Sequence, residues 1–217
     1  MNIIDTSSNT NLKNHQNDSI TNIPLFHIKG IDYMLSSKNY TDIIFQSISS
    51  VEFFKEKEIL KNKNIYSMGP STKNYLAQKE INSICPEIPG SKELNKLLLE
   101  NRTKGKYLII KGEDGLNDVF NHLNKNGENV EELICYTRIK LDKYDHIKKN
   151  FTEADAIIFS STFAVEIFFE EIHSSNIKAK LFGISNRIIK FISEFGYEAK
   201  FINYFSGDIE ESVKIST

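Results

Sequence analysis

The amino-acid sequence predicts an α/β protein whose parallel sheets are covered by helices on both faces. Short apolar runs rich in β-branched residues, such as DIIF (42–45) and AIIF (156–159), are typical of strands buried on both sides. Each run leads into a turn of small residues and then into apolar residues at helical spacing. This alternation of strand and helix indicates parallel pairing. With 217 residues, the chain can form one large domain or two small ones.

The run at 42–45 begins a segment that the chain repeats. Residues 41–54 align without a gap on residues 155–168, and seven of the fourteen aligned positions are identical. The same offset of 114 residues brings Gly69 onto Gly183 and Ser71 onto Ser185. We therefore predict that each copy folds as strand, turn, helix, strand, turn and helix, with Ser71 or Thr72 capping the second helix of the first copy.

The other elements follow from the same patterns. Residues 6–22 hold few large apolar side chains and are expected to form a polar loop. Residues 116–123 place apolar side chains on one face of a helix that starts at Leu116, and residues 206–213 predict a last short helix. The predicted strands are 42–45, 65–68, 107–111, 133–141, 156–159 and 180–184, and the expected helix stops are Gly127 and Gly196.

Composition and charge exclude several classes of protein. The chain is 40% apolar and 26% charged, which is typical of globular domains, and its net charge of −2 gives no reason to expect a nucleic-acid partner. No run approaches the ~20 apolar residues that a membrane span needs, and no secretory signal is visible at the N-terminus. Cys85 and Cys135 are far apart and are expected to be reduced thiols of a cytoplasmic protein.

The histidines and cysteines show no metal-ligand spacing, and the chain has neither a P-loop nor a GxSxG motif. The sequence therefore predicts neither a metal nor a phosphate-loop cofactor.

Small polar residues gather where the predicted strands end. Parallel sheets bind ligands at the carboxyl ends of their strands, and free backbone N–H groups of helix N-termini favour anions. The predicted turns therefore favour an anionic ligand in a cleft, although capping a helix is the commoner duty of any single Ser or Thr. These turns are residues 47–50, 69–72, 112–115, 160–163 and 183–186.

Tyr136 is the candidate acid. In the extended segment CYTRIK, alternation places Tyr136, Arg138 and Lys140 on one face and Cys135 on the other. A phenol beside two cations would have a lowered pKa and could act as a general acid. The alternative is that Tyr136 packs in the core, which is the more frequent role of a strand tyrosine.

Together these segments resemble the uroporphyrinogen-III synthase family. The resemblance is carried by DIIFQSISSVEFF, MGPSTKNYL, the long segment from YLIIKGEDG to VEELICYTR, DAIIFSSTFAVEIFF and LFGISNRIIKFISEFGY, in the family's order. It implies two flavodoxin-like α/β domains joined by a two-stranded antiparallel ladder. Residues 24–30 and 134–140 would form the ladder, residues 1–25 with 141–217 one domain, and residues 31–133 the other.

The resemblance also implies a reaction. The substrate would be the linear tetrapyrrole hydroxymethylbilane, whose carboxylates suit the predicted turns. The enzyme would release the hydroxyl of ring A as water and close the macrocycle with inversion of ring D, without a metal or organic cofactor. Hydroxymethylbilane synthase, which supplies this substrate, is the further partner that the resemblance suggests.

The family's site residues map onto this sequence one by one. Tyr136 matches its candidate acid, and the other matches are implied to bind substrate. The implied substrate-binding residues are Ser47, Ser49, Ser71, Thr72, Lys111, Gly112, Ser161, Thr162 and Ser185. The chain departs from the family where a first strand usually ends in Thr-Arg, since NIIDTSSN has no arginine, and where GISN (183–186) replaces a GPxT-like turn. The backbone donors of these turns would therefore contribute more to binding.

Two other functions fit the same features. A non-catalytic module with two similar domains could bind a small anion, and a diverged homologue could act as a regulator. Turnover of hydroxymethylbilane separates the enzyme from both alternatives.

Overall fold

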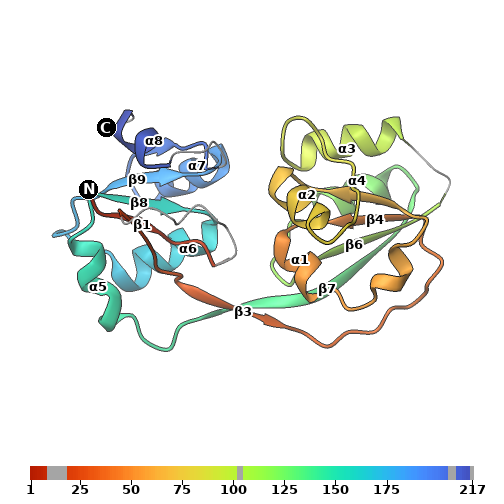
Figure 1. Ribbon diagram of the computed structural model, residues 1–217, viewed down its shortest axis with the longest axis horizontal. Helices are drawn as coiled ribbons and strands as arrows, with labels where there is room; N and C mark the ends of the chain where they lie inside the picture. Colours follow the sequence, from red (N-terminus) through yellow and green to blue (C-terminus); the bar gives the residue numbers. More distant parts are fainter. Residues whose placement is uncertain (9–18, 102–104, 205–208, 216–217) are drawn as a thin grey trace. The chain divides into compact units, whose positions relative to one another are not determined.

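A computed structural model describes residues 1–8, 19–101, 105–204 and 209–215. The chain divides into two compact units. Unit 1 contains Met1–His27 and Ile139–Thr217, and unit 2 contains Ile28–Arg138 (Figure 1). Parts of two predicted segments, the loop at 6–22 and the helix at 206–213, lie outside the described residues.

The sheet of unit 2 has the order β3-β7-β6-β4-β5, and β7, β6, β4 and β5 are parallel. Beyond β5, Ile84 forms an isolated parallel bridge with Tyr66. The strands are β3 (Phe26–Gly30), β4 (Asp42–Phe45), β5 (Asn64–Ser67), β6 (Lys106–Gly112) and β7 (Asn129–Lys140).

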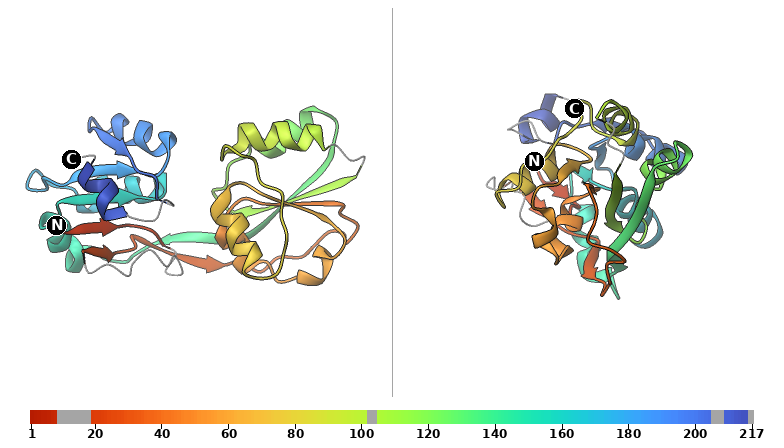
Figure 2. Two further views of the ribbon diagram at one scale, coloured as in Figure 1. Left: turned by 45° about the horizontal axis from the view of Figure 1, so that its top comes forward. Right: turned by 90° about the vertical axis from the view of Figure 1, so that its right-hand side faces the viewer.

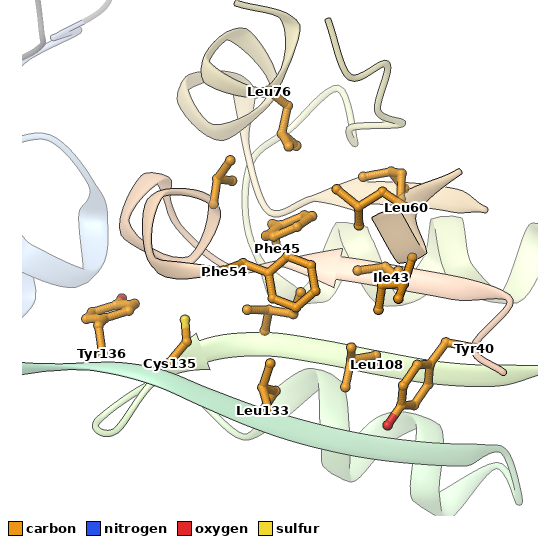
Figure 3. Packing of buried hydrophobic residues seen from close by; sticks show 14 residues of the cluster. Tyr40, Ile43, Phe45, Phe54, Leu60, Leu76, Leu108, Leu133, Cys135 and Tyr136 are labelled. Carbon is orange, nitrogen blue, oxygen red and sulfur yellow. The ribbon is translucent and has the colours of Figure 1, made fainter. Parts of the chain in front are cut away.

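Helices cover both faces of this sheet because successive residues of a strand point to opposite sides. Ile43 and Phe45 lie in one cluster of buried side chains, together with side chains of α1 and α2 (Figure 3). Ile44, between them, lies in the other cluster, with side chains of α3 and α4. The helices are α1 (Ile48–Phe53), η1 (Lys57–Leu60), α2 (Pro70–Ala77), α3 (Ser91–Glu100) and α4 (Asp118–Lys125).

Unit 1 is built in the same way around a parallel sheet of order β10-β9-β8-β1-β2 (Figure 2). Its strands are β1 (Ile3–Asp5), β2 (Ile20–Asn22), β8 (Ala156–Phe159), β9 (Lys180–Gly183) and β10 (Ala199–Phe201). Its helices are α5 (Asp145–Thr152), α6 (Thr162–Ile167), the π-helical η2 (Phe168–Ile172), α7 (Asn186–Glu194) and α8 (Ile209–Ile215). Counted along the chain, the order is 2-1-3-4-5, that of flavodoxin-like sheets.

The repeat seen in the sequence is a repeat of structure. β4 and β8 start 114 residues apart, and so do α1 and α6. The partner strands β5 and β9 are instead 116 residues apart, and the bridge of Ile84 with Tyr66 recurs at that offset as Lys200 with Phe182. The predicted pairing of Gly69 with Gly183 is therefore wrong: Gly69 is the N-cap of α2, whereas Gly183 ends β9.

Two strands carry the chain between the units. β3 leaves unit 1 and enters unit 2, and its neighbour β7 returns from unit 2 to unit 1, so the two run in opposite directions. The predicted class is confirmed: two flavodoxin-like parallel-sheet units are joined by a two-stranded ladder.

Several local predictions need correction. Residues 20–22 form β2 rather than part of a loop, because Ile20 packs in the core while Asn22 pairs with Asp5. Neither Ser71 nor Thr72 caps α2, whose N-cap is Gly69 followed by Pro70 at the first helical position. Leu116 precedes α4 and is 41% exposed, so it does not belong to the core face. The stops at Gly127 and Gly196 are confirmed by their positive φ angles of 74° and 83°.

Candidate active site

The predicted residues of unit 2 lie at the carboxyl ends of β4, β5 and β6. The chain runs from β4 to β5 on one side and continues with β6 on the other side of β4. Such a reversal is the usual ligand-binding position of an open parallel sheet. Ser47 follows β4, and Gly112 is the last residue of β6, so both flank this position.

Ser47 is held by the helix that it caps. Its Oγ accepts a hydrogen bond from the Ser50 backbone N–H at 3.0 Å, and the Ser50 Oγ accepts one from the Ser47 backbone N–H at 3.1 Å. This reciprocal capping box satisfies two N–H groups at the start of α1 and fixes the Ser47 hydroxyl. Ser49, one residue earlier than Ser50, is buried in the first turn of α1.

Tyr136 reaches Ser47 from β7. The two hydroxyl oxygens are 2.9 Å apart and share a hydrogen bond across 89 residues of sequence. Tyr136 is only 3% exposed, and its ring centroid lies 6.1 Å from that of Phe53. Tyr136 therefore packs in the core, as the second alternative drawn from the sequence has it, and its phenol also has a polar partner.

A β-bulge puts Tyr136 in this place. Lys111 is paired with Ile134, but the next residue, Gly112, is paired with Tyr136, so no residue of β6 is paired with Cys135. The predicted alternation is therefore wrong: Cys135 and Tyr136 both lie in the same buried cluster, as Figure 3 shows. Burial raises the pKa of the Cys135 thiol to about 12, which leaves it protonated and unreactive.

Gly112 makes room for the phenol ring. A Cβ atom on Gly112 would lie 2.5 Å from two ring carbons of Tyr136. The turn that follows also holds the tyrosine backbone, because the Glu113 N–H donates to the Tyr136 carbonyl at 2.9 Å. The Thr137 hydroxyl donates in turn to the Glu113 carboxylate at 2.7 Å. The sequence did not reveal Glu113 and Thr137, because their pairing depends on the bulge.

Two lysines that the sequence brought into the predicted site, Lys111 and Lys140, are engaged elsewhere. The Lys111 ammonium is 2.7 Å from the Glu132 carboxylate and also donates to the Asn117 side chain, and the residue is 3% exposed. Lys140 forms an ion pair with Glu170 in unit 1, which raises the pKa of Lys140. Within the described ranges, neither Arg138 nor Lys140 has a hydrogen bond with the phenol of Tyr136.

The remaining predicted residues are distributed over three helix starts. Ser71 and Thr72 lie in the first turn of α2; Ser71 is half-buried and Thr72 is buried. In unit 1, the Ser161 Oγ caps α6 by accepting from the Ala164 N–H at 3.1 Å, and Thr162 is the first residue of that helix. Ser185 caps α7 with a longer bond of 3.4 Å to the Ile188 N–H.

Unit 1 also contains a buried polar network that the sequence did not indicate. The Asp5 carboxylate at the end of β1 accepts hydrogen bonds from the Tyr204 hydroxyl, from the Ser7 N–H at 2.8 Å and from the Ser7 hydroxyl at 3.0 Å. The Asn22 side chain donates to the Asp5 and Ser7 carbonyls, each at 2.9 Å. Burial, and then the charge of Asp5, raise the pKa of the Tyr204 phenol.

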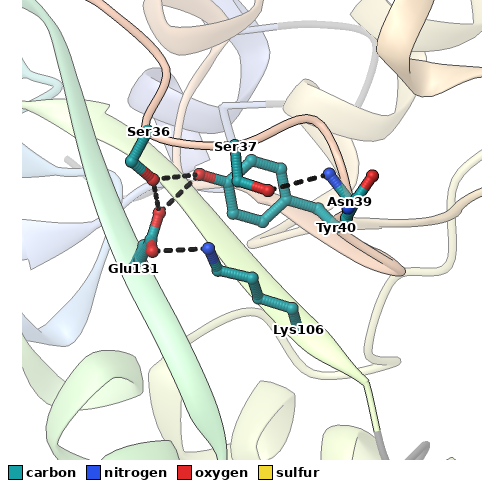
Figure 4. Close-up of polar contacts among 6 residues, drawn as sticks. All are labelled: Ser36, Ser37, Asn39, Tyr40, Lys106 and Glu131. Carbon is teal, nitrogen blue, oxygen red and sulfur yellow. Dashed lines mark hydrogen bonds and ion pairs between the residues drawn. The ribbon is translucent and has the colours of Figure 1, made fainter.

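A second polar cluster lies at the opposite edge of the sheet of unit 2, where β6 and β7 begin. The Glu131 carboxylate is 2.6 Å from the Lys106 ammonium and accepts hydrogen bonds from Ser36 and Tyr40 (Figure 4). Lys106 first, and then the two hydroxyls, lower the pKa of Glu131 to about 2. This cluster joins the segment before β4 to the sheet and is remote from the Ser47 edge.

Across the described ranges, no group of three or more His, Cys, Asp or Glu side chains is arranged to hold a metal ion. No helix in the same ranges has the length and apolar character needed to cross a bilayer.

Comparison with known proteins identifies relatives. The sequence matches the family model described as Uroporphyrinogen-III synthase HemD over residues 20–203. The fold is similar to uroporphyrinogen-III synthetase from Helicobacter pylori, with a TM-score of 0.72, 12% identity and coverage of 99% of this chain and 97% of that chain. It is also similar to a mutant uroporphyrinogen III synthase from Thermus thermophilus, with a TM-score of 0.58, 12% identity and coverage of 91% and 88%. No curated protein matches the sequence significantly.

Proposed function

The chain belongs to the uroporphyrinogen-III synthase family, and on this premise we propose that it converts hydroxymethylbilane into uroporphyrinogen III. One observation carries the proposal beyond family membership. The phenol of Tyr136 and the hydroxyl of Ser47 are hydrogen-bonded at the reversal point of the sheet of unit 2, where a ligand is expected.

The proposed reaction needs a proton donor at one carbon–oxygen bond. The hydroxyl of the ring A hydroxymethyl group leaves as water once it is protonated, and the azafulvene that remains is attacked by ring D. Attack through a spiro intermediate inverts ring D before the macrocycle closes. The protein supplies a hydroxyl proton for the first step and holds the chain in the conformation that favours inversion.

The carboxylates of the substrate would be bound by hydroxyls and backbone N–H groups of the strand-end turns. Such groups bind carboxylates well even when lysines are engaged elsewhere, as Lys111 is here. We assign this role in unit 2 to the first turn of α2 and to Gly112, and in unit 1 to the starts of α6 and α7. The residues concerned are Ser71, Thr72, Gly112, Ser161, Thr162 and Ser185.

A coupled assay tests the proposal. Hydroxymethylbilane is generated in solution by hydroxymethylbilane synthase, the purified protein is added, and the oxidised products are separated as uroporphyrin isomers I and III. Isomer III well above the control without protein supports the proposed reaction. Isomer I alone, obtained with folded protein, contradicts it, because isomer I forms spontaneously.

The second candidate function is a non-catalytic homologue that binds an anionic tetrapyrrole or regulates another protein. The start of unit 1 favours it, since NIIDTSSN has no arginine after β1 and the Asp5 carboxylate there is bonded to Ser7 and Tyr204. Binding of hydroxymethylbilane without formation of isomer III would support this second function.

A further inference from the structure

The exposure of the two hydroxyl groups decides which of them a substrate can reach. Tyr136 is 3% exposed, and its ring lies between Gly112 and the packed side chains of its cluster. Ser47 is half-buried, so this residue is partly open to solvent whereas Tyr136 is not. A ligand at this edge of the sheet would therefore meet the Ser47 hydroxyl before the phenol.

The acceptors available to the two hydroxyl groups fix the direction of the hydrogen bond between Tyr136 and Ser47. The Ser47 oxygen already accepts a bond from the Ser50 N–H, and its second lone pair can accept the phenol proton. In the opposite direction, Ser47 would donate to the phenol oxygen, and the buried phenol proton would have no acceptor among the described residues. Because buried donors are nearly always satisfied, the phenol donates to Ser47. The proton of Ser47 is then directed away from Tyr136.

We propose that Tyr136 and Ser47 form a two-hydroxyl proton relay, an inference that rests on the proposed function. The C–O bond of the hydroxymethyl group breaks as its oxygen takes the proton of Ser47 and leaves as water. Ser47 regains a proton from Tyr136, which becomes a phenolate. When ring D has attacked and loses its proton to restore aromaticity, that proton returns to Tyr136 through Ser47. Over the whole cycle the enzyme regains from ring D the one proton that it gives to the leaving hydroxyl, and water is the only species released besides the product.

The repeated copy in unit 1 shows that capping does not require this pairing. Ser161, 114 residues after Ser47, caps α6 through the equivalent bond to the N–H three residues later. Within the described ranges, no tyrosine is hydrogen-bonded to Ser161. The bond to a buried phenol is therefore a feature that Ser47 has in addition to its structural duty.

Variants at Ser47 separate capping from proton transfer. Ser47→Thr keeps both the cap and the hydroxyl, and we expect it to retain much more of the wild-type kcat than a variant without the hydroxyl. Ser47→Asn keeps a capping oxygen but has no hydroxyl proton to transfer. We expect Ser47→Asn and Tyr136→Phe each to lower kcat by about 100-fold, with KM changed by less than about twofold. The double variant should lose no more than the worse single variant, because the two groups act as a unit.

A solvent isotope experiment adds a readout that a structural role would not change. In mixtures of H2O and D2O, two protons moving in one step give a curved dependence of kcat on the deuterium fraction, whereas one proton gives a straight line. The matched variant Ser161→Ala removes an equivalent cap and is expected to raise KM and leave that curve unchanged. Circular dichroism and thermal melting verify that every variant is folded.

Three outcomes overturn the relay. If Ser47→Asn keeps the wild-type kcat while Tyr136→Phe loses it, Tyr136 protonates the substrate directly. If both variants keep it, neither hydroxyl takes part in the rate-limiting step. If the wild-type protein forms no isomer III, the proposed function fails and the relay fails with it. In the other two outcomes the wild type forms isomer III, so only the relay fails.

Discussion

The Cα atom of Gly112 lies so close to the Tyr136 ring that a Cβ atom there would be 2.5 Å from two ring carbons. Because β6 carries Gly112 and β7 carries Tyr136, the contact fixes the ring against the neighbouring strand, with its hydroxyl on Ser47.

We therefore expect Gly112→Ala to disturb both stability and activity. The methyl group must push the ring or the strand aside, which costs about 1–3 kcal/mol of unfolding free energy. Moving the ring also lengthens the hydrogen bond between the Tyr136 phenol and the Ser47 hydroxyl, so kcat should fall. Gly127→Ala is the control, since no atom lies within 4 Å of its Cβ position and its φ of 74° alone causes strain. Denaturant unfolding measures the stability of both variants, and the isomer assay should show a loss of kcat only for Gly112→Ala. Equal kcat values for the two variants would contradict the role of the contact.

Glu131 should make stability depend on acid pH. Its pKa is lowered from 4.5 to about 2, so the stability it contributes is present above about pH 4.5 and is lost as the pH falls toward 2. Because its side chain is 35% exposed, water screens the effect, and we expect a contribution of about 1 kcal/mol. The free energy of unfolding, measured between about pH 5 and pH 2, should fall less steeply with pH in Glu131→Gln than in the wild type. Parallel curves for the two proteins would show that the cluster has no such effect.

Lys111 should act on stability rather than on substrate affinity. Lys111→Met removes a buried ammonium and leaves the Glu132 carboxylate, whose side chain is 25% exposed, without its partner, which should cost about 2 kcal/mol. Adding Glu132→Gln removes the unpaired charge and should recover about half of that loss. A variant that unfolds like the wild type but binds substrate more weakly would instead make Lys111 a substrate ligand.

Tyr204 should stabilise unit 1 through Asp5. Tyr204→Phe removes one donor from a fully buried carboxylate, and we expect it to cost about 1–3 kcal/mol. Tyr197→Phe is the matched control, because Tyr197 is 41% exposed and should change stability by less than about 0.5 kcal/mol. Chemical denaturation of both variants tests this expectation, which does not survive if their unfolding free energies are equal.

The sequence predicts local features well and tertiary pairings poorly. The strand at 42–45 and its copy at 156–159 are correct, because runs of β-branched residues identify strands without further context. The bulge beside Cys135 escapes prediction, since the pairing register of β6 and β7 depends on both strands together.

The same limit applies to the candidate site. The sequence places Ser47 at a strand end and Tyr136 in a strand, but their hydrogen bond joins residues 89 positions apart. Asp5 and Tyr204, 199 positions apart, are not linked by any pattern in the sequence. Their contact exists because the chain that follows β10 brings Tyr204 to the end of β1, although β9 and β8 lie between the two strands in the sheet.

The change of offset from 114 to 116 residues has an evolutionary meaning. If the two halves descend from one duplicated ancestor, they differ by two inserted or deleted residues between Phe168 and Lys180, the interval that contains η2. A π-helical turn accommodates additional residues without displacing the strand that follows. Alignments of the two halves therefore need a gap between Phe168 and Lys180. Without that gap, Ser71 is compared with Ser185 although the capping residue of α2 is Gly69, and ancestral residues at the second turn would be reconstructed in the wrong register.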